Sequence, residues 1–265
     1  MLSPRLVERD LLDPREVGEA AARPIASAIN IPFSELPHRT QELPPRSRVV
    51  RVAGPPTLVR EVVAWLESNG RRAEAADEFR YEPPGRSSDV GRLWQPNAFL
   101  SQVLPELNGG SALDVACGTG RDAVFMASCG WEVTGVDVLP DALERARDLA
   151  QRCAAAIRPI HWVQADLEGG RVEWDRPFDL VTVIRYLHRP LFGLLGDWLR
   201  PGGSVVYETY TTLHRRRHGK PARDAHVLQP GELPRLLTGL RIRHYSEDWH
   251  NDAHTARVWA VRPGP

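Results

Sequence analysis

The sequence Ser-Ala-Leu-Asp-Val-Ala-Cys-Gly-Thr-Gly-Arg-Asp occupies residues 111–122 and decides how the rest of the chain is interpreted. A short apolar run that carries one acid, Asp114, is followed by Gly118 and Gly120, and a helical pattern begins near Asp122. This pattern predicts a strand, a glycine-rich turn and the start of a helix. Glycines at such a turn let the backbone approach a ligand closely, and the helix start adds unpaired N–H groups.

A second acid ends the next apolar run. Asp137 lies near the end of the stretch 133–138, seventeen residues after Gly120. An acid at the end of the second strand of such a unit commonly binds ribose hydroxyls. The turn differs from the dinucleotide pattern, because no third glycine lies where a pyrophosphate would sit. The alternative interpretation is a generic turn of an α/β fold.

The word Asp-x-x-Cys-Gly-x-Gly at 114–120 resembles motif I of the class I methyltransferases, which use S-adenosylmethionine (SAM) as methyl donor. The resemblance implies that Asp114 and the turn hold the amino-acid end of SAM and that Asp137 holds its ribose. It also implies that Asp166, after a third apolar run, binds the adenine amino group, with the next residue packed on the ring. The implied cofactor residues are Asp114, Ala116, Cys117, Gly118, Gly120, Asp137, Val138, Asp166, Leu167 and Ile184.

Polar residues follow the fourth expected strand of this fold. Residues 178–184 are apolar and match the family word Phe-Asp-Leu-Val. Because ligands in open α/β sheets bind beyond the carboxyl ends of the strands, we expect Arg185, Tyr186 and His188 to be catalytic and to face the methyl acceptor. A hydroxyl or amine acceptor benefits from a base, whereas a soft nucleophile needs little help. The candidate bases, each with an alternative as a packing residue, are His188, Tyr186, Glu208 and Tyr210.

The rest of residues 93–265 completes a Rossmann-like α/β domain with a seven-stranded sheet. Further strands are expected at Glu132–Asp137, Ile160–Ala165 and Ser204–Thr209, with an antiparallel closing pair at 240–250 and 255–262. Helices are expected at 98–107, 122–129 and 141–153. Several words, such as Tyr186-Leu187-His188-Arg189-Pro190, are similar to those of the tellurite-resistance and thiopurine-type methyltransferases. This finer similarity implies a small acceptor.

The first 82 residues predict a separate small α/β domain, joined by a Pro-, Gly- and Ser-rich linker at 83–92. Strands at 11–13 and 49–52, with a helix capped by Thr57, resemble a rhodanese-like domain. That family carries a persulfide on a cysteine directly after its third strand, where this chain has Ala53. Two following prolines also remove N–H donors from the loop. We therefore expect a degenerate rhodanese-like module used for packing, dimerisation or partner binding; an unrelated small extension is the alternative.

A basic segment, His-Arg-Arg-Arg-His-Gly-Lys-Pro-Ala-Arg, follows the fifth strand at 214–223 and is expected to be a loop. It fits a solvated loop or lid, a lid that attracts a small acidic substrate, or a contact to RNA. The net charge of +0 gives the chain no general attraction for nucleic acid or an anionic membrane, so neither is an expected partner.

The overall composition indicates a protein of ordinary globular type. The chain has 265 residues with 42% hydrophobic content, and no apolar stretch is long enough to span a membrane. The three cysteines lack metal-type spacing, so we expect no metal and reduced thiols in a cytoplasmic protein.

Three functional hypotheses follow. The first is a SAM-dependent methyltransferase for a small molecule, with a soft S, Se or Te nucleophile as one class of acceptor and a homodimer through the N-terminal domain as one form of assembly. The second is an RNA or protein methyltransferase that uses the N-terminal domain and residues 214–223 to hold its substrate. The third is a scaffold that binds SAM without catalysis.

Overall fold

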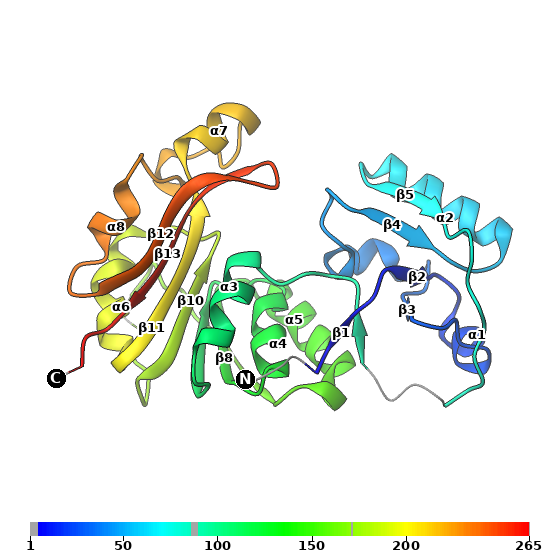
Figure 1. Cartoon of the computed structure of the whole chain (residues 1–265), viewed down its shortest axis with the longest axis horizontal. Helices are drawn as coiled ribbons and strands as arrows, with labels where there is room; N and C mark the ends of the chain where they lie inside the picture. Colours follow the sequence, from blue (N-terminus) through cyan, green and yellow to red (C-terminus); the bar gives the residue numbers. More distant parts are fainter. Residues whose placement is uncertain (1–4, 86–89, 171, 265) are drawn as a thin grey trace. The chain divides into compact units, whose positions relative to one another are not determined.

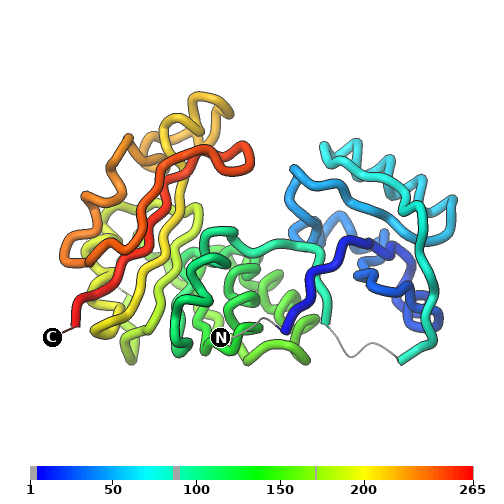
Figure 2. Tube along the Cα trace, in the orientation of Figure 1, coloured from blue at the N-terminus to red at the C-terminus, as the bar shows by residue number. Residues whose placement is uncertain are grey.

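The computed structural model describes residues 5–85, 90–170 and 172–264, and the chain forms two compact units, which we describe separately (Figures 1 and 2). The N-terminal unit comprises residues 5–95 and the C-terminal unit begins at Pro96. The expected linker at 83–92 differs from this division. Residues 86–89 of it lie outside the described residues, while β6 (Gly91–Arg92) pairs in parallel with β1 (Val7–Glu8) inside the N-terminal unit.

The N-terminal unit is built on a parallel four-stranded sheet with the order β3-β2-β4-β5. Its strands are β2 (Leu11–Asp13), β3 (Ala28–Asn30), β4 (Val49–Val52) and β5 (Arg72–Ala75). Its helices are α1 (Val17–Ala22), α2 (Pro56–Ser68) and the short 3-10 helices η1 (Leu36–His38) and η2 (Thr40–Glu42). The buried face of α2, with Val59, Val62 and Leu66, packs into the same core as Leu12 and Val50, so one hydrophobic cluster holds sheet and helix together.

Helix α2 begins differently from the expectation. Thr57 is expected to cap it, but the helix starts two residues earlier, at Pro56, with Pro55 at the N-cap and no side-chain cap. Proline fits the first helical position, because the N–H that it lacks would have no partner inside the helix.

The C-terminal unit contains the expected seven-stranded sheet, with the order β12-β13-β11-β10-β7-β8-β9. Its strands are β7 (Ser111–Val115), β8 (Glu132–Asp137), β9 (Ile160–Gln164), β10 (Phe178–Ile184), β11 (Leu199–Tyr210), β12 (Arg241–His250) and β13 (Ala253–Val261). Strands β7 to β11 are parallel, and β13 pairs antiparallel with both β11 and β12, as expected. The strand order reverses between β7 and β10, so the carboxyl ends of these two neighbours form a switch point at which ligands commonly bind.

Helices flank this sheet on two sides, with α4 and α5 on one side and α6 and α8 on the other (Figure 1). The helices are α3 (Ala98–Val103), α4 (Arg121–Ser128), α5 (Pro140–Arg152), α6 (Phe192–Trp198), α7 (Thr212–His218) and α8 (Glu232–Leu236). The 3-10 helices are η3 (Leu104–Glu106), η4 (Ala154–Ala156), η5 (Arg189–Leu191) and η6 (Asp224–His226). Within the described ranges, each helix is too short or too polar to cross a membrane.

The segment 214–223 is only partly a loop. Its first half lies in α7, which ends at Gly219 in a left-handed conformation with φ of +68°. A glycine in this conformation commonly ends a helix, since no Cβ opposes it. The expectation of a loop was therefore wrong for residues 214–218.

Candidate functional site

The turn after β7 combines one glycine required for packing with one that faces open space. A Cβ added to Gly120, where φ is +78°, would lie 2.7 Å from the Trp162 ring and 2.8 Å from the Cβ of Ala146. A Cβ added to Gly118, where φ is +53°, would meet nothing within 4 Å. Ala116 also has a positive φ, of +53°. The turn is therefore anchored at Gly120 and accessible at Gly118, which leaves room for a ligand against its backbone.

Asp114 is a buried acid with one unused oxygen. Its side chain is on β7, the residue is 2% exposed, and Oδ1 accepts a hydrogen bond of 2.9 Å from the Thr182 hydroxyl. Its Oδ2 is buried and makes no well-formed hydrogen bond among the described residues, although the Ala123 N–H lies near enough to the carboxyl to lower its pKa in part. Burial, followed by the charge of Asp122, raises the pKa of Asp114 to about 8. An unpartnered buried oxygen is costly, and it marks a place where a cationic ligand group would be stabilised.

Asp137 ties the end of β8 to the same turn. One carboxylate oxygen accepts the Gly118 N–H at 2.8 Å and the other accepts the Leu139 N–H at 2.9 Å. The next two residues, Val138 and Leu139, are 50% and 59% exposed, which is unusual for apolar side chains beside a buried acid. Asp137 therefore orients the turn, and the apolar pair offers a surface next to it.

The side chain of Tyr186, which follows β10, reaches toward the residues after β9, where the sequence predicts binding of the adenine. Asp166 is exposed and accepts the Glu168 N–H at 2.9 Å, and the Tyr186 hydroxyl donates to Glu168 at 3.1 Å. Burial and the neighbouring acids Glu168, Asp166 and Asp137 raise the pKa of Tyr186. The phenol thus stays protonated at neutral pH. The half-buried Leu167 packs against the core of the unit.

Arg185 lies directly after β10 in a strained backbone conformation. Its φ is +58°, in a region that non-glycine residues rarely occupy, and its N–H donates to the Glu208 carbonyl at 2.6 Å. Its guanidinium lies over the Tyr210 ring, 5.4 Å from the ring centre. The preceding residue, Ile184, is half-buried. Since β11 neighbours β10, the geometry directs Arg185 toward β11, whereas the hydroxyl of Tyr186 points toward β9.

His188 follows on the same segment without a fixed side-chain partner. The residue is half-buried, and within the described part of the chain its ring makes no hydrogen bond or ion pair. The next residue, Arg189, is held firmly, because its Nε lies 2.6 Å from Oε1 of Glu232 and its guanidinium also donates to two backbone carbonyls. The segment is therefore anchored at Arg189, beside a histidine ring that can meet a ligand.

A buried polar network that the sequence did not predict supports this edge of the sheet. Asn97 donates from its side chain to Glu208 at 2.8 Å and from its backbone to Asp122 at 2.6 Å. It also caps α3 by accepting the Leu100 N–H. Glu208, 2% exposed, forms an ion pair of 3.1 Å with Arg257. An asparagine before an apolar helical run is a sequence signal for the cap, but its contact with residue 208, over a hundred positions away, has no local signature.

The first two residues of α4, Arg121 and Asp122, carry opposite charges, and burial shifts the pKa of each. Burial, opposed by Arg121 and Arg185 among others, raises the pKa of Asp122. Burial also lowers the pKa of Arg121, opposed by Asp122 and assisted by Arg185. Cys117 is a half-buried thiol whose pKa is raised by burial and by Asp114, so it is no nucleophile at neutral pH. The structure thus places acids on both sides of the turn and arginines toward β10.

The loop after β4 in the N-terminal unit lacks the groups that sulfur chemistry would need. Ala53 is fully buried and its N–H donates to the Leu12 carbonyl at 2.9 Å, so it is not free to bind an anion. The motif Asp13-x-Arg15 forms a buried ion pair of 2.7 Å, which makes its contribution structural. The corresponding loop also holds Pro55 and Pro56, which have no N–H.

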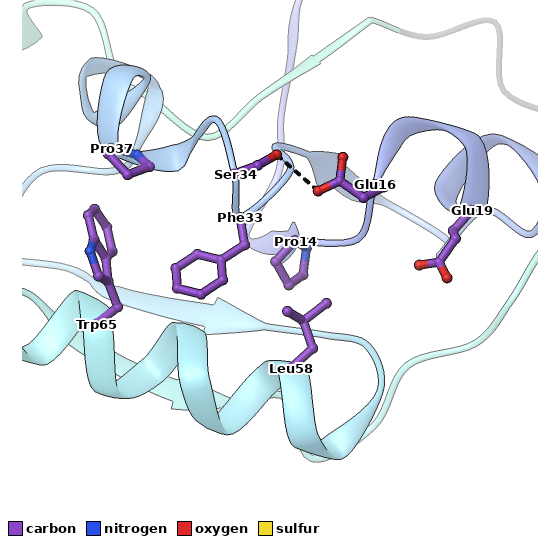
Figure 3. Close-up of a pocket in the computed structure, with 8 residues that line it drawn as sticks. All are labelled: Pro14, Glu16, Glu19, Phe33, Ser34, Pro37, Leu58 and Trp65. Atoms are coloured by element: carbon purple, nitrogen blue, oxygen red, sulfur yellow. Dashed lines mark hydrogen bonds between the residues drawn. The ribbon is translucent and has the colours of Figure 1, made fainter.

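An apolar pocket of about 500 Å³ lies beside this loop, within the same unit (Figure 3). Its residues are Pro14, Glu16, Glu19, Phe33, Ser34, Pro37, Leu58 and Trp65. Phe33 and Trp65 meet edge to face with ring centres 6.1 Å apart. The Ser34 hydroxyl donates to Glu16 at 2.9 Å at the border of the pocket, while the carboxylate of Glu19 lies farther from the aromatic rings.

The C-terminal unit is similar to methyltransferases in both sequence and fold. Residues 112–203 match the family model described as a methyltransferase domain. The ubiquinone biosynthesis O-methyltransferase of Proteus mirabilis is 32% identical over 116 residues, which cover 42% of this chain and 46% of that protein. The protein-L-isoaspartate O-methyltransferase of Stenotrophomonas maltophilia is 27% identical over 191 residues, covering 69% of this chain and 80% of that protein. The chain thus spans under half the length of the Proteus relative.

Solved structures agree on the fold. The N-methyltransferase NodS of Bradyrhizobium japonicum has a TM-score of 0.51 and 21% identity, covering 62% of this chain and 92% of that chain. TehB of Haemophilus influenzae has a TM-score of 0.52 and 13% identity, covering 69% of this chain and 73% of that chain. At such identities these structures establish the architecture alone. Taken with the family match over residues 112–203 and the strand order, they show that the C-terminal unit contains a methyltransferase domain with a Rossmann-like α/β fold.

Proposed function

We propose that this chain is an active methyltransferase that transfers a methyl group from SAM to a small-molecule acceptor. The observation that carries the proposal is the buried Oδ2 of Asp114 on β7, four residues before Gly118, where an added Cβ would meet open space. A cationic ammonium group such as that of SAM would satisfy this oxygen, and the open glycine would admit it. The residues of the turn therefore fit the cofactor.

Each part of SAM has residues of suitable chemistry. Asp114 would hold the ammonium group and Arg121, at the start of α4, the carboxylate. Asp137 would hold the ribose and Asp166 the adenine. The other residues that would line this site are Ala116, Cys117, Val138, Leu167 and Ile184. When bound, SAM supplies a methyl group on a positively charged sulfur that a nucleophile can displace.

The acceptor would lie near Arg185 and His188, which are directly beyond β10. The main contribution of these residues would be alignment of the nucleophile, because in-line displacement depends on proximity and orientation. Of the four candidate bases, Glu208 is occupied by Arg257, Tyr210 lies under the Arg185 guanidinium, and burial and the neighbouring acids raise the pKa of Tyr186 and keep it protonated. His188 has a free ring among the described residues, so it is the base that we favour for a hydroxyl or amine acceptor. A soft S, Se or Te nucleophile, as in the tellurite-resistance and thiopurine-type branch, would need none.

The N-terminal unit would act as a degenerate rhodanese-like module for partner binding or dimerisation. The absence of a cysteine at Ala53 and the pocket lined by Phe33 and Trp65 favour binding over sulfur transfer. The three free cysteines are consistent with a cytoplasmic location.

Transfer of label from methyl-labelled SAM tests the proposal. The purified protein is incubated with a cell extract, and the products are separated into volatile, small soluble, RNA and protein fractions. Asp137→Ala should abolish labelling, since it removes both backbone contacts of the carboxylate. Asp148→Ala, an exposed acid on α5, is the matched control and should leave labelling unchanged.

The fractions distinguish the competing functions. Label in volatile or small soluble products supports the proposal. Label in RNA or protein would replace it with a macromolecular acceptor, although two arginines of α7 are already paired, Arg215 with Asp224 and Arg217 with Asp252. Binding of SAM with no label in any fraction from several extracts would favour a scaffold that binds SAM without catalysis.

A further inference from the structure

Arg185 presents a guanidinium without an acidic partner at the carboxyl edge of the sheet. In the described part of the chain no carboxylate forms an ion pair with it. Two other arginines at this edge are paired: Arg189 with Glu232 at 2.6 Å and Arg257 with Glu208 at 3.1 Å. The fold therefore leaves the exposed guanidinium of Arg185 available where the methyl acceptor would lie.

Two contacts with β11 hold Arg185 in place. Its backbone N–H donates to the Glu208 carbonyl at 2.6 Å, and its guanidinium lies over the Tyr210 ring, 5.4 Å from the ring centre. Tyr210 stacks on His214, with ring centres 4.1 Å apart and planes inclined by 17°. The ring centre of His214 lies 4.5 Å from that of His218. A guanidinium supported by a stacked column loses less conformational entropy on binding than a free one.

The neighbouring titratable groups do not cancel this charge. Glu208 is shared by Arg257 and the Asn97 side chain. Asp122 accepts the Asn97 N–H and forms no ion pair with Arg185 among the described residues, although Arg185 opposes the rise that burial causes in the pKa of Asp122. His214, whose pKa is lowered by burial and then by His218 and Arg185, is neutral at pH 7 and adds no competing positive charge.

We propose that Arg185, braced by Tyr210, binds a carboxylate on the methyl acceptor, so that the site selects acceptors that carry this anion. A guanidinium and a carboxylate form two parallel charge-assisted hydrogen bonds, which fix the orientation of the acceptor as well as its affinity. The proposal rests on the proposed function, because it takes the space beyond β10 and β11 as the acceptor site.

Benzoate and benzamide are suitable probes, because they have nearly the same shape and only benzoate is charged. Their affinities are measured by calorimetry on the full chain saturated with S-adenosylhomocysteine (SAH), the product of SAM. Benzoate should bind about tenfold more tightly than benzamide. Arg185→Gln should abolish this preference and Tyr210→Leu should reduce it about threefold. Arg216→Gln, at an exposed position of α7, is the matched control and should keep it.

Three results with the probes would overturn the proposal: equal affinities of benzoate and benzamide, no binding of benzoate at about 10 mM, or a preference for benzoate that survives Arg185→Gln. A fourth would be a loss of SAH affinity in Arg185→Gln as large as the loss of benzoate affinity. The last result would mean that Arg185 holds the cofactor. Failure of the wild-type chain to bind SAH would refute the proposed function instead, and the same titrations without SAH would then test the arginine by itself.

Discussion

The raised pKa of Asp114 predicts that cofactor affinity depends on pH. Without a ligand, burial and the charge of Asp122 hold the pKa of Asp114 at about 8, so its carboxyl is mostly protonated at pH 7. The ammonium group of SAM or SAH is best stabilised by the carboxylate form. Binding below pH 8 must therefore release a proton, and we expect affinity to rise as the pH rises toward 8.

The size of the effect follows from the distance between pH and pKa. Each unit below the pKa costs about 1.4 kcal/mol, or a factor of ten in the dissociation constant. With a pKa of about 8, affinity at pH 6.5 should be roughly 20- to 30-fold weaker than at pH 8.5. At pH 7, close to one proton should be released for each ligand bound.

Calorimetry with SAH measures both quantities. SAH retains the ammonium and carboxylate groups of SAM and cannot transfer a methyl group. Titrations at pH 6.5, 7.5 and 8.5 give the affinity, and two buffers of different ionisation enthalpy give the number of protons released.

Two variants separate Asp114 from its neighbours. Asp114→Asn should weaken binding at pH 8.5 and remove the dependence on pH. Asp122→Asn should keep the dependence but move its midpoint to lower pH, because the charge of Asp122 contributes to the raised pKa. The reasoning is refuted if wild-type affinity is constant from pH 6.5 to 8.5, or if the dependence survives Asp114→Asn.

Three further predictions concern stability. Gly120→Ala should lower the free energy of unfolding by about 2–4 kcal/mol in urea titrations, because of its φ of +78° and the Trp162 ring 2.7 Å from the added Cβ; a loss below about 0.5 kcal/mol would contradict this. Arg189→Met should cost about 1 kcal/mol by breaking the contact with Glu232 and should speed proteolysis of residues 219–231, whereas unchanged cleavage would show that the pair is not needed there. Because the pKa of Asp114 is raised from 3.8 to about 8 on folding, the folded chain binds more protons than the unfolded chain between pH 4 and 8, and the contribution of Asp114 to the free energy of unfolding falls as the pH rises through that window. Asp114→Asn should therefore raise the Tm of the ligand-free protein at pH 8.5 and not at pH 4. An unchanged Tm at pH 8.5 would contradict this prediction.

The sequence predicted the sheet of the C-terminal unit well, because its central strands β7 and β10 are mainly apolar runs bounded by turn residues. Such a pattern is local, and so are the glycines that shape the turn after β7. The basic segment was assigned to a loop although Gly219 follows a run of arginines, a pattern that also fits the end of a helix. The arginine-rich composition favours a loop, whereas the glycine at 219 marks the end of a helix.

The supporting network of the site had no comparable signal. Asn97, Asp122 and Glu208 are spread over more than a hundred residues, and only the packing of α3 and α4 beside β11 brings them together. Tyr186 shows the same limit, since the adjacent residue Arg185 has a positive φ and lies over Tyr210 of β11, whereas the Tyr186 hydroxyl reaches Glu168 beyond the end of β9. Chain position alone could not separate them.

Asp114 and Arg185, which form no ion pair among the described residues, lie at the ends of neighbouring strands, yet each is held by a different contact. Asp114 on β7 is fixed by the Thr182 hydroxyl, and Arg185 after β10 by the Glu208 carbonyl and the Tyr210 ring. If they formed an ion pair with each other, both charges would be satisfied and the space between them would close. Because separate contacts hold them, the folded chain retains the cost of the buried Asp114 oxygen, which a cationic ligand group can recover, while the exposed guanidinium of Arg185 remains open to an anion.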